Sequence, residues 1–344
     1  MKGLLETIQD FYIYPSIGPD DWRYVYQTAQ ARAMEMQMLP RSVLLDMANA
    51  PDYQQAVNLL ATSEYGALAS VQDMDQVEKV LLARRAQARE LFAQWMLDDR
   101  ITTFFRSRDD FLNLRLGLKR MVSKQPIGAD YSQEGNVPAD RWAAIFEQQD
   151  FDPLPSYLQE AVEQALVAYY QTKDIRRIDL AMDQFQSSYS LEQARRIGHV
   201  FIINLFRIQI DLNNIRTILR LKLAPTDLPG LLLDGGFLET DRLNAALEGP
   251  VEALPSLFHY GPYQRVVDEA VRYLLAHQSF LGLEQACDDH VLGFLRSTVC
   301  IASGPQPIIA YLLQKEHQIR MVRFILVAKR HHLQTGLIVE RLAA

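Results

Sequence analysis

An internal repeat constrains this 344-residue chain more than any other feature of its sequence. The segment 110–119 matches the segment 211–220 without gaps at an offset of 101 residues, and both fit the pattern D-x-x-N-[LI]-R-x-x-L-[KR]. A weaker copy lies 107 residues further on, at 318–326, where the apolar–arginine pair and the leucine remain but the aspartate and the asparagine do not. Such a period predicts a chain built from repeated structural units.

The hydrophobic spacing around these copies predicts long amphipathic helices. In the middle copy the apolar positions follow steps of four and three residues, at Phe201, Leu205, Ile208, Leu212, Ile215 and Leu219. That spacing keeps one apolar face over about five helical turns. Five of the six equivalent positions are apolar in the last copy and four of the six in the first. The arginine of each copy directly follows a residue of this stripe, so we expect it at the flank of the buried face.

We therefore predict an all-α protein of three homologous helical units, at residues 20–125, 140–225 and 235–335. Two segments rich in glycine, proline and polar residues, 124–138 and 224–236, are predicted to be loops between the units. No convincing run alternates apolar and polar residues with a period of two, so we expect no sheet.

An acidic residue recurs upstream of each motif arginine, inside a run that reads as a helix. The three pairs, separated by 37, 37 and 39 residues, are Glu78 with Arg115, Asp179 with Arg216, and Glu284 with Arg323. The near-constant spacing suggests an ion pair between two helices in each unit, although chance among abundant charges is an alternative. The role would be structural or partner-docking rather than catalytic, because an arginine stays charged and cannot carry protons.

The motifs of common active sites are absent from the sequence. There is no Gly-rich phosphate loop, no dinucleotide-binding turn, no nucleophile elbow and no zinc-protease helix, so we expect no nucleotide, cofactor or metal to bind directly. An all-α enzyme that uses Asp288, Asp289 and His290 is the weakest alternative, because nothing supplies a nucleophile, a base and an orienting group together. The two cysteines, Cys287 and Cys300, exclude a disulfide framework and are predicted to be buried thiols.

Charge and hydropathy limit the compartments and partners that the chain can have. The net charge of −7 argues against a general nucleic-acid binder, which needs an excess of lysine and arginine. The first 18 residues carry acids where a signal peptide needs an apolar run, and the long uncharged stretch 297–314 contains two prolines. We expect a cytoplasmic chain whose only membrane role is peripheral. Basic clusters at 84–89, 106–120 and 315–330 are either solvated faces or a docking surface for an acidic partner.

The segment 304–329 resembles the signature helix of one family, the C subunit of bacterial and archaeal V/A-type rotary ATPases, whose counterpart in the eukaryotic vacuolar enzyme is the d subunit. The family pattern is close to G-x-x-P-x-I-x-Y-L-x-x-K-E-x-E-I-x-N-[IL]-R-x-I-x-x-x-K. This chain departs from it at Gln318, where glutamate is usual, and at Met321, where asparagine is usual. The segments 26–35, 60–65, 211–222 and 235–238 also resemble the family, whereas 124–160 matches poorly and could be a lineage-specific connection.

The resemblance implies a non-catalytic part of a rotary machine. Three similar helical units with pseudo-three-fold symmetry would form a funnel or socket that receives the tip of the central shaft, which is made of the D and F subunits. The other face would sit on the membrane proteolipid ring, at the cytoplasmic side, so that rotation passes between shaft and ring during ion transport. Arg115, Arg216 and Arg323 would then line or brace the mouth of the socket. A free-standing helical scaffold that binds another cytoplasmic partner is the alternative.

Overall fold

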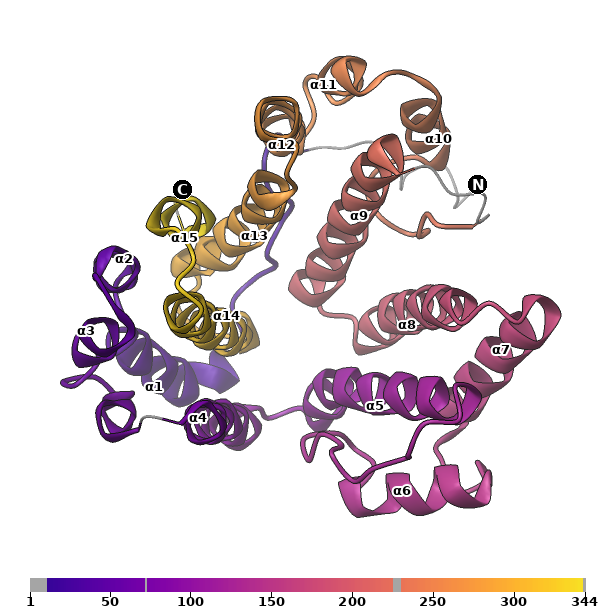
Figure 1. Cartoon of the computed structure of the whole chain (residues 1–344), viewed down its shortest axis with the longest axis horizontal. Helices are drawn as coiled ribbons and strands as arrows, with labels where there is room; N and C mark the ends of the chain where they lie inside the picture. Colours follow the sequence, from indigo (N-terminus) through magenta and orange to yellow (C-terminus); the bar gives the residue numbers. More distant parts are fainter. Residues whose placement is uncertain (1–10, 72, 225–229, 343–344) are drawn as a thin grey trace. The chain divides into compact units, whose positions relative to one another are not determined.

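A computed structural model describes residues 11–71, 73–224 and 230–342, and it is helical with no strand among those residues (Figure 1). The all-α prediction is therefore confirmed. The chain divides into two compact units, of which unit 1 is Asp98–Glu248 and unit 2 combines residues 11–97 with residues 249–342. The three repeat units remain a prediction, and residues 225–229 of the second predicted loop lie outside the described residues.

Unit 1 contains the first two copies of the repeat. Its helices are α5 (Asp99–Val122), α6 (Ala139–Gln148), α7 (Ser156–Thr172), α8 (Arg176–Ile197), α9 (Val200–Leu223) and α10 (Thr240–Glu248). The side chains of α5, α6, α7 and α8 share one apolar core, in which Trp142 and Phe146 of α6 pack against Leu114 and Leu118 of α5. Gly117 allows this close approach, because a Cβ there would lie 1.9 Å from the ring of Phe146.

The predicted stripe explains why α5 and α9 form where they do. All six stripe residues of α9 are buried, and five of the six equivalents on α5 are buried, with Arg100 as the exception. Asp98 caps the start of α5, and its carboxylate accepts the Arg100 N–H at 3.0 Å. Helix α8 ends at Gly198, whose positive φ of 78° allows the chain to turn into α9. The loop predicted over 124–138 is confirmed, since α6 begins only at Ala139.

The polar residues of the repeat hold the loop that follows each long helix. Asp110 accepts hydrogen bonds from the N–H of Val137 at 2.9 Å and from the Asn136 side chain at 2.8 Å. Asn113 both donates to the Ser132 carbonyl and accepts from the Ser132 N–H. Burial of both side chains strengthens these bonds, because no water competes for them.

The second copy repeats this arrangement at the same spacing. Asp211 accepts from the N–H groups of Phe237 and Leu238 at 2.8 and 3.1 Å, and Asn214 exchanges two hydrogen bonds with the backbone of Leu233. The segment 124–160, which matched the family poorly, is therefore folded on the same plan as the segment after α9. The segment differs from the family in its side chains, but its backbone is held by Asp110 and Asn113 as the segment after α9 is held by Asp211 and Asn214.

Unit 2 brings the two ends of the chain together. Its longer helices are α1 (Val25–Glu35), α2 (Arg41–Asn49), α3 (Tyr53–Asn58), α4 (Met74–Trp95), α12 (Gln264–His277), α13 (Leu281–Arg296), α14 (Pro305–Arg330) and α15 (Thr335–Leu342). Short turns complete it: η1 (Trp22–Tyr24), η2 (Gly66–Ser70), η3 (Val251–Ala253), α11 (Leu254–Leu257) and η4 (Ser297–Cys300). Helix α14 packs against α1, α2, α3, α4 and α13, which makes it the centre of the unit (Figure 1).

The start of α14 is tied to the beginning of the chain. Gln306 is fully buried and donates to the carbonyls of Ile17 and Pro19 at 3.2 and 2.9 Å. Asp20 accepts the N–H groups of Ala302 and Ser303 at 2.8 and 3.1 Å. The Gly-Pro-Gln-Pro segment of the signature helix is thus the attachment point for the N-terminal strap, which we define as residues 11–20.

Two further expectations are settled by unit 2. Cys287 is buried as predicted, but Cys300 is exposed, because it ends the short η4 turn rather than an apolar helix. Within the described ranges no helix has both the length and the apolarity that crossing a bilayer requires.

Candidate partner-docking surface

In unit 1, the first motif arginine joins α5 to α8. Arg115 pairs with Asp183 and lies 3.8 Å from Asp179, while Lys119, one turn further along, bonds Asp179 at 2.9 Å. Helices α5 and α8 run side by side (Figure 1). The Arg115 side chain is only 26% exposed, so most of its surface is already used within the chain.

In unit 2, the third motif arginine joins α14 to α4. Arg323 bonds Glu78 at 2.6 Å. The ion pairs therefore link two helices, as expected, but the partners differ from those that the spacing suggested. Asp179 pairs with Arg115 and not with the arginine 37 residues downstream of it, and Glu78 pairs with Arg323. The physical reason is packing: α4 lies against α14, and α8 lies between α5 and α9 in the contacts it makes, with Asp179 on the side of α5.

The remaining pair of predicted site residues lies in different units. Arg216 is half-buried on α9 of unit 1, and Glu284 is half-buried in the first turn of α13 in unit 2. Both side chains already take part in interactions. A role for them in docking stays a prediction.

Several residues of the basic clusters form ion pairs with acidic residues of the same chain. Arg89 bonds Glu316 at 2.7 Å, and Arg85 lies 3.7 Å from the same carboxylate. Lys315 occupies a stripe position of α14, is buried, and pairs with Glu64. Burial lowers the pKa of Lys315 to about 8, which opposes the ion pair that keeps it charged. These contacts fix α14 to α4 and to the segment before η2.

Sequence reasoning missed Tyr65 and Gln318 as partners in this cluster. The hydroxyl of Tyr65 donates to the Gln318 side chain at 3.2 Å, and the Gln318 amide donates to the Leu39 carbonyl at 3.1 Å. Gln318 stands where the family usually has glutamate. This glutamine in place of glutamate was the sequence signal that the side chain must donate a hydrogen bond, here to the Leu39 carbonyl.

The weakest alternative, acid–base chemistry at 288–290, finds no support in the geometry. Asp288 pairs with Arg341, whereas the ring of His290 lies between Tyr14 and Tyr263, with centroids 5.1 and 5.0 Å away. Burial lowers the pKa of His290 to about 4 and raises the pKa of Asp289. The three side chains face different surroundings. Among the described residues no group of three or more histidine, cysteine, aspartate or glutamate side chains could hold a metal ion.

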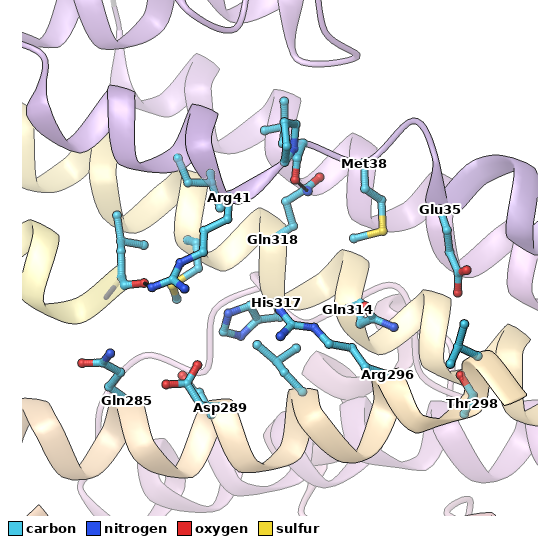
Figure 2. Close-up of a pocket in the computed structure, with 18 of the residues that line it drawn as sticks. Glu35, Met38, Arg41, Gln285, Asp289, Arg296, Thr298, Gln314, His317 and Gln318 are labelled. Atoms are coloured by element: carbon cyan, nitrogen blue, oxygen red, sulfur yellow. Dashed lines mark hydrogen bonds between the residues drawn. The ribbon is translucent and has the colours of Figure 1, made fainter. Parts of the chain in front are cut away.

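A cavity of about 690 Å³ lies in unit 2 between α1, α2, α13 and α14 (Figure 2). Ionisable side chains from all four helices reach its walls, including Glu35, Arg41, Asp289 and His317. None of the predicted docking arginines lines it. It is therefore a feature that the repeat analysis did not anticipate.

The sequence of the chain matches known proteins along nearly its whole length. The model of one family, described as ATP synthase (C/AC39) subunit, matches residues 27–341. The C subunit of the V-type sodium ATPase of Enterococcus hirae is 20% identical over 318 residues, which cover 90% of this chain and 95% of that protein. The C subunit of the A-type ATP synthase of Thermococcus kodakarensis is 25% identical over 325 residues, which cover 88% and 86%.

A third relative, the C subunit of the A-type ATP synthase of Methanosphaera stadtmanae, is 22% identical over 332 residues, which cover 89% of this chain and 84% of that protein. The match thus extends over both units and includes the segment 124–160. The resemblance first noted at 304–329 is confirmed for the chain as a whole. The chain belongs to the ATP synthase (C/AC39) subunit family, whose members are structural and not catalytic subunits of V-type and A-type rotary ATPases.

Proposed function

We propose that this chain is the central-stalk adaptor of a V/A-type rotary ATPase or ATP synthase, which connects the D and F subunits of the shaft to the membrane proteolipid ring. The observation that carries the proposal is the family match over residues 27–341, which covers nearly the whole chain. The adaptor makes and breaks no covalent bond. Its task is to pass rotation between the shaft and the ring at the cytoplasmic face of the membrane.

The structure supports this function through its stiffness. Three long helices, α5, α9 and α14, each bury most or all of their stripe positions, and buried polar residues on each helix hold a neighbouring segment by hydrogen bonds. Close-packed interiors transmit strain because their side chains have no free volume in which to relax. A body of this kind suits an element that must turn without deforming.

The motif arginines are assigned a bracing role within this proposal. Arg115 and Arg323 each bond an acid on a neighbouring helix, so their charge is already balanced within the chain. Replacing Arg115, Arg216 and Arg323 together by glutamine tests the assignment. If they brace, the free energy of unfolding falls while the affinity for the D–F shaft is retained. A loss of shaft affinity with unchanged stability would show instead that they dock the shaft.

The function itself is tested by assembly. The chain carrying an affinity tag is purified from native membranes under mild detergent, and the proteins that accompany it are identified by mass spectrometry. We expect D, F and the proteolipid to be recovered together. In a second step, the purified chain is mixed with D–F alone and with the ring alone, and it should bind each and bridge both. Recovery of neither would favour a free-standing helical scaffold.

A further inference from the structure

Helix α1 and the turn η1 before it expose an apolar face in unit 2. Met36 is 89% exposed, Tyr26 70% and Trp22 68%. Residues three or four apart lie on one side of a helix, so these side chains and the exposed residues between them at that spacing share one face. We call this set the α1 seam: Trp22, Val25, Tyr26, Ala29, Ala33 and Met36.

The opposite face of α1 is the one that unit 2 buries. Tyr24, Thr28 and Ala31 are buried, and α1 packs against α14 (Figure 1). The Thr28 hydroxyl donates to the Gly304 carbonyl at 3.2 Å and accepts the Gly304 N–H at 3.1 Å, which fixes the rotation of α1 on α14. A surface helix ordinarily turns its apolar face to the core and its polar face to solvent. Helix α1 exposes a face without a charged or amide side chain, which indicates that another molecule covers it.

The charges beside the α1 seam are paired within the chain. Arg23 bonds Asp21 at 2.6 Å, and Arg32 bonds Glu35 at 2.7 Å. A helix that lies on a lipid surface presents lysine and arginine on its polar face to the headgroups. The face opposite the seam is instead packed against α14, and both flanking arginines have acid partners. The seam therefore favours an uncharged apolar protein surface over a membrane.

The order of large and small residues along the α1 seam fits a second helix. The positions 22, 26, 29, 33 and 36 follow steps of four and three residues, which is the a/d spacing of a coiled-coil helix. Ala29 and Ala33 lie one turn apart between Tyr26 and Met36, so the centre of the seam is low and its ends are raised. Small side chains at a helix contact allow the two helix axes to come closer together.

The size of the α1 seam indicates how its occupant is held. Residues 22–36 extend over roughly 22 Å, and a helix face about 10 Å wide then offers on the order of 200 Å². A stable complex of two proteins buries roughly 800 Å² on each partner, so this face alone does not hold two copies of the chain together. A helix that other contacts already keep nearby needs no larger area, because its effective concentration is high. A neighbouring subunit of an assembly satisfies that condition.

We propose that the α1 seam packs against an apolar α-helix of another subunit of the rotary complex. Ala29 and Ala33 form the point of closest approach, and Trp22 and Tyr26 are the anchors, since tryptophan and tyrosine contribute most at protein interfaces. As far as the partner is a subunit of that complex, the inference rests on the proposed function. That function assigns no role to these four side chains.

Two substitutions of the same alanines test the seam. Ala29→Glu with Ala33→Glu places charge on it, whereas Ala29→Leu with Ala33→Leu keeps it apolar but fills its low centre. Each variant and the wild-type chain carry different tags, are produced together in equal amounts, and compete for incorporation into the rotary complex, which quantitative mass spectrometry measures. We expect each double variant to be incorporated about tenfold or more weakly than the wild type. The matched control, Ala83→Glu with Ala86→Glu at exposed positions of α4, should compete equally.

The outcomes separate the seam from the proposed function. Incorporation of both variants at the wild-type level would overturn the seam and leave the proposed function intact, whereas a wild-type chain that joins no rotary complex would remove both. A loss in the glutamate variant alone would contradict a close helix contact and favour a loosely packed or lipid cover. Circular dichroism establishes that each variant is folded, and a free chain whose dimerisation the leucine pair abolishes would identify a second copy and refute the proposal.

A cross-link identifies the occupant in the intact complex. Gln37 is exposed directly after Met36, and Cys287 is buried, so Gln37→Cys with Cys300→Ser places one accessible thiol at the end of the seam. A maleimide–benzophenone reagent on this thiol is activated by light, and the cross-linked peptides are sequenced, with Cys300→Ser alone as the control. A cross-link to a segment of another subunit with apolar residues at steps of three and four supports the proposal. Cross-links confined to lipid, to a second copy of the chain or to charged segments would contradict it.

Discussion

The same anchoring position is filled by a carboxylate in unit 1 and by an amide in unit 2. In unit 1 the buried side chains of Asp110 and Asp211 accept the N–H groups of Val137 and Leu238, each two residues before a short helix, α6 or α10. In unit 2 the equivalent position on α14 is Gln318, which donates to the carbonyl of Leu39, two residues before α2.

The difference follows from the direction in which the chain reaches the anchor. Helices α6 and α10 come shortly after the long helix that holds them, and their loops present N–H groups. Helix α2 comes from the other end of the chain, and Leu39, 279 residues before Gln318, presents a carbonyl. An ionised carboxylate cannot donate to a carbonyl, whereas a glutamine amide donates to Leu39 and accepts from Tyr65. The third copy of the repeat is therefore altered to suit the backbone group that faces it.

The far ends of the short helices show that the rest of the plan is kept. The ammonium group of Lys222 on α9 donates to the Leu247 carbonyl in the last turn of α10, at 2.5 Å. Lys329, at the equivalent position of α14, donates to the Ala50 carbonyl just beyond α2 at 2.6 Å. A cation at a helix C-terminus also interacts favourably with the helix dipole. Both ends of α2 are thus held as both ends of α10 are.

Removing the anchors should give the largest effect on stability. Replacing Asp110 or Asp211 by alanine leaves at least two donors without an acceptor, so we expect a loss of about 4 kcal/mol in the free energy of unfolding. At Asp110 the substitution also removes the acceptor of the Tyr157 hydroxyl, which donates to it at 2.8 Å. Replacing Gln318 by alanine removes its hydrogen bonds with Tyr65 and Leu39 and a longer one from Lys315, and should cost about 2 kcal/mol. Urea denaturation measures all three.

The comparison has a matched control on the same helix. Asn213 is exposed on α9, two residues from Asp211, and Asn213→Ala should change stability by no more than about 0.5 kcal/mol. Equal losses for Asp211→Ala and Gln318→Ala would show that the charge of the anchor contributes nothing. The carboxylate and the amide would then stabilise their units equally, each with its own backbone partner.

The N-terminal strap packs against a third kind of buried side chain, the titratable imidazole of His290. His290 packs against Tyr14 of the strap and has a folded-state pKa of about 4, below its ordinary value of 6.5. Between those pH values the unfolded chain binds the proton more readily, so stability falls as the pH is lowered from 6.5 to 4. The full difference is about 3 kcal/mol. His290→Phe keeps a ring between the tyrosines and should remove most of that pH dependence.

The measurement is the free energy of unfolding between pH 7 and pH 4. His331→Phe, at an exposed position, should leave the slope unchanged. His317, whose pKa is also lowered to about 4, should account for the slope that persists in His290→Phe. A variant with the wild-type slope would mean that the strap is held without regard to the charge of His290.

Two glycines sharpen the comparison of the carboxylate anchors with each other. A Cβ at Gly236 would lie 1.9 Å from Oδ1 of Asp211, and a Cβ at Gly135 would lie 2.3 Å from Oδ1 of Asp110. Alanine at either position must push the loop off its anchor, at a cost of about 2 kcal/mol, and Gly236→Ala should cost more. Gly249→Ala is the control, because nothing lies within 4 Å of its Cβ. Thermal denaturation measures the three variants. A loss of stability in Gly249→Ala as large as in the other two would refute the close approach of Gly135 and Gly236 to the two carboxylates.

The sequence predicted the long helices because burial itself sets their period. Each stripe position from Phe201 to Leu219 must face the core, so the pattern of apolar residues is sufficient to place α9. The attachment of the loops to the long helices could not be predicted in the same way, since Asp211 bonds backbone N–H groups, which leave no mark on the side chains of the loop. One signal was present: Gly135 and Gly236 are separated by the same 101 residues as the two aspartates.

The candidate site was predicted less well than the fold. The residue types of the ion pairs were identified, but the partners were not, because a fixed spacing along the chain says nothing of which helices pack together. Arg41 and Arg296 could not be found at all. They line one cavity because α2 and α13 both pack against α14 and α15 in unit 2, and no motif joins them in the sequence.

The smallest effects on stability are expected for two ion pairs, Arg323–Glu78 in unit 2 and Arg115–Asp183 in unit 1. The Arg323 side chain is 59% exposed and has one acid partner, so a double-mutant cycle of Arg323→Gln with Glu78→Gln should give a coupling of about 0.5 kcal/mol, reduced by salt. Arg115 is less exposed and lies near two acids, so its coupling to Asp183 should be about 1 kcal/mol. Equal coupling energies would show that the second acid and the lower exposure of Arg115 do not strengthen its ion pair. The ion pairs would then stabilise the α5–α8 and α4–α14 contacts equally, although the two units use different anchors.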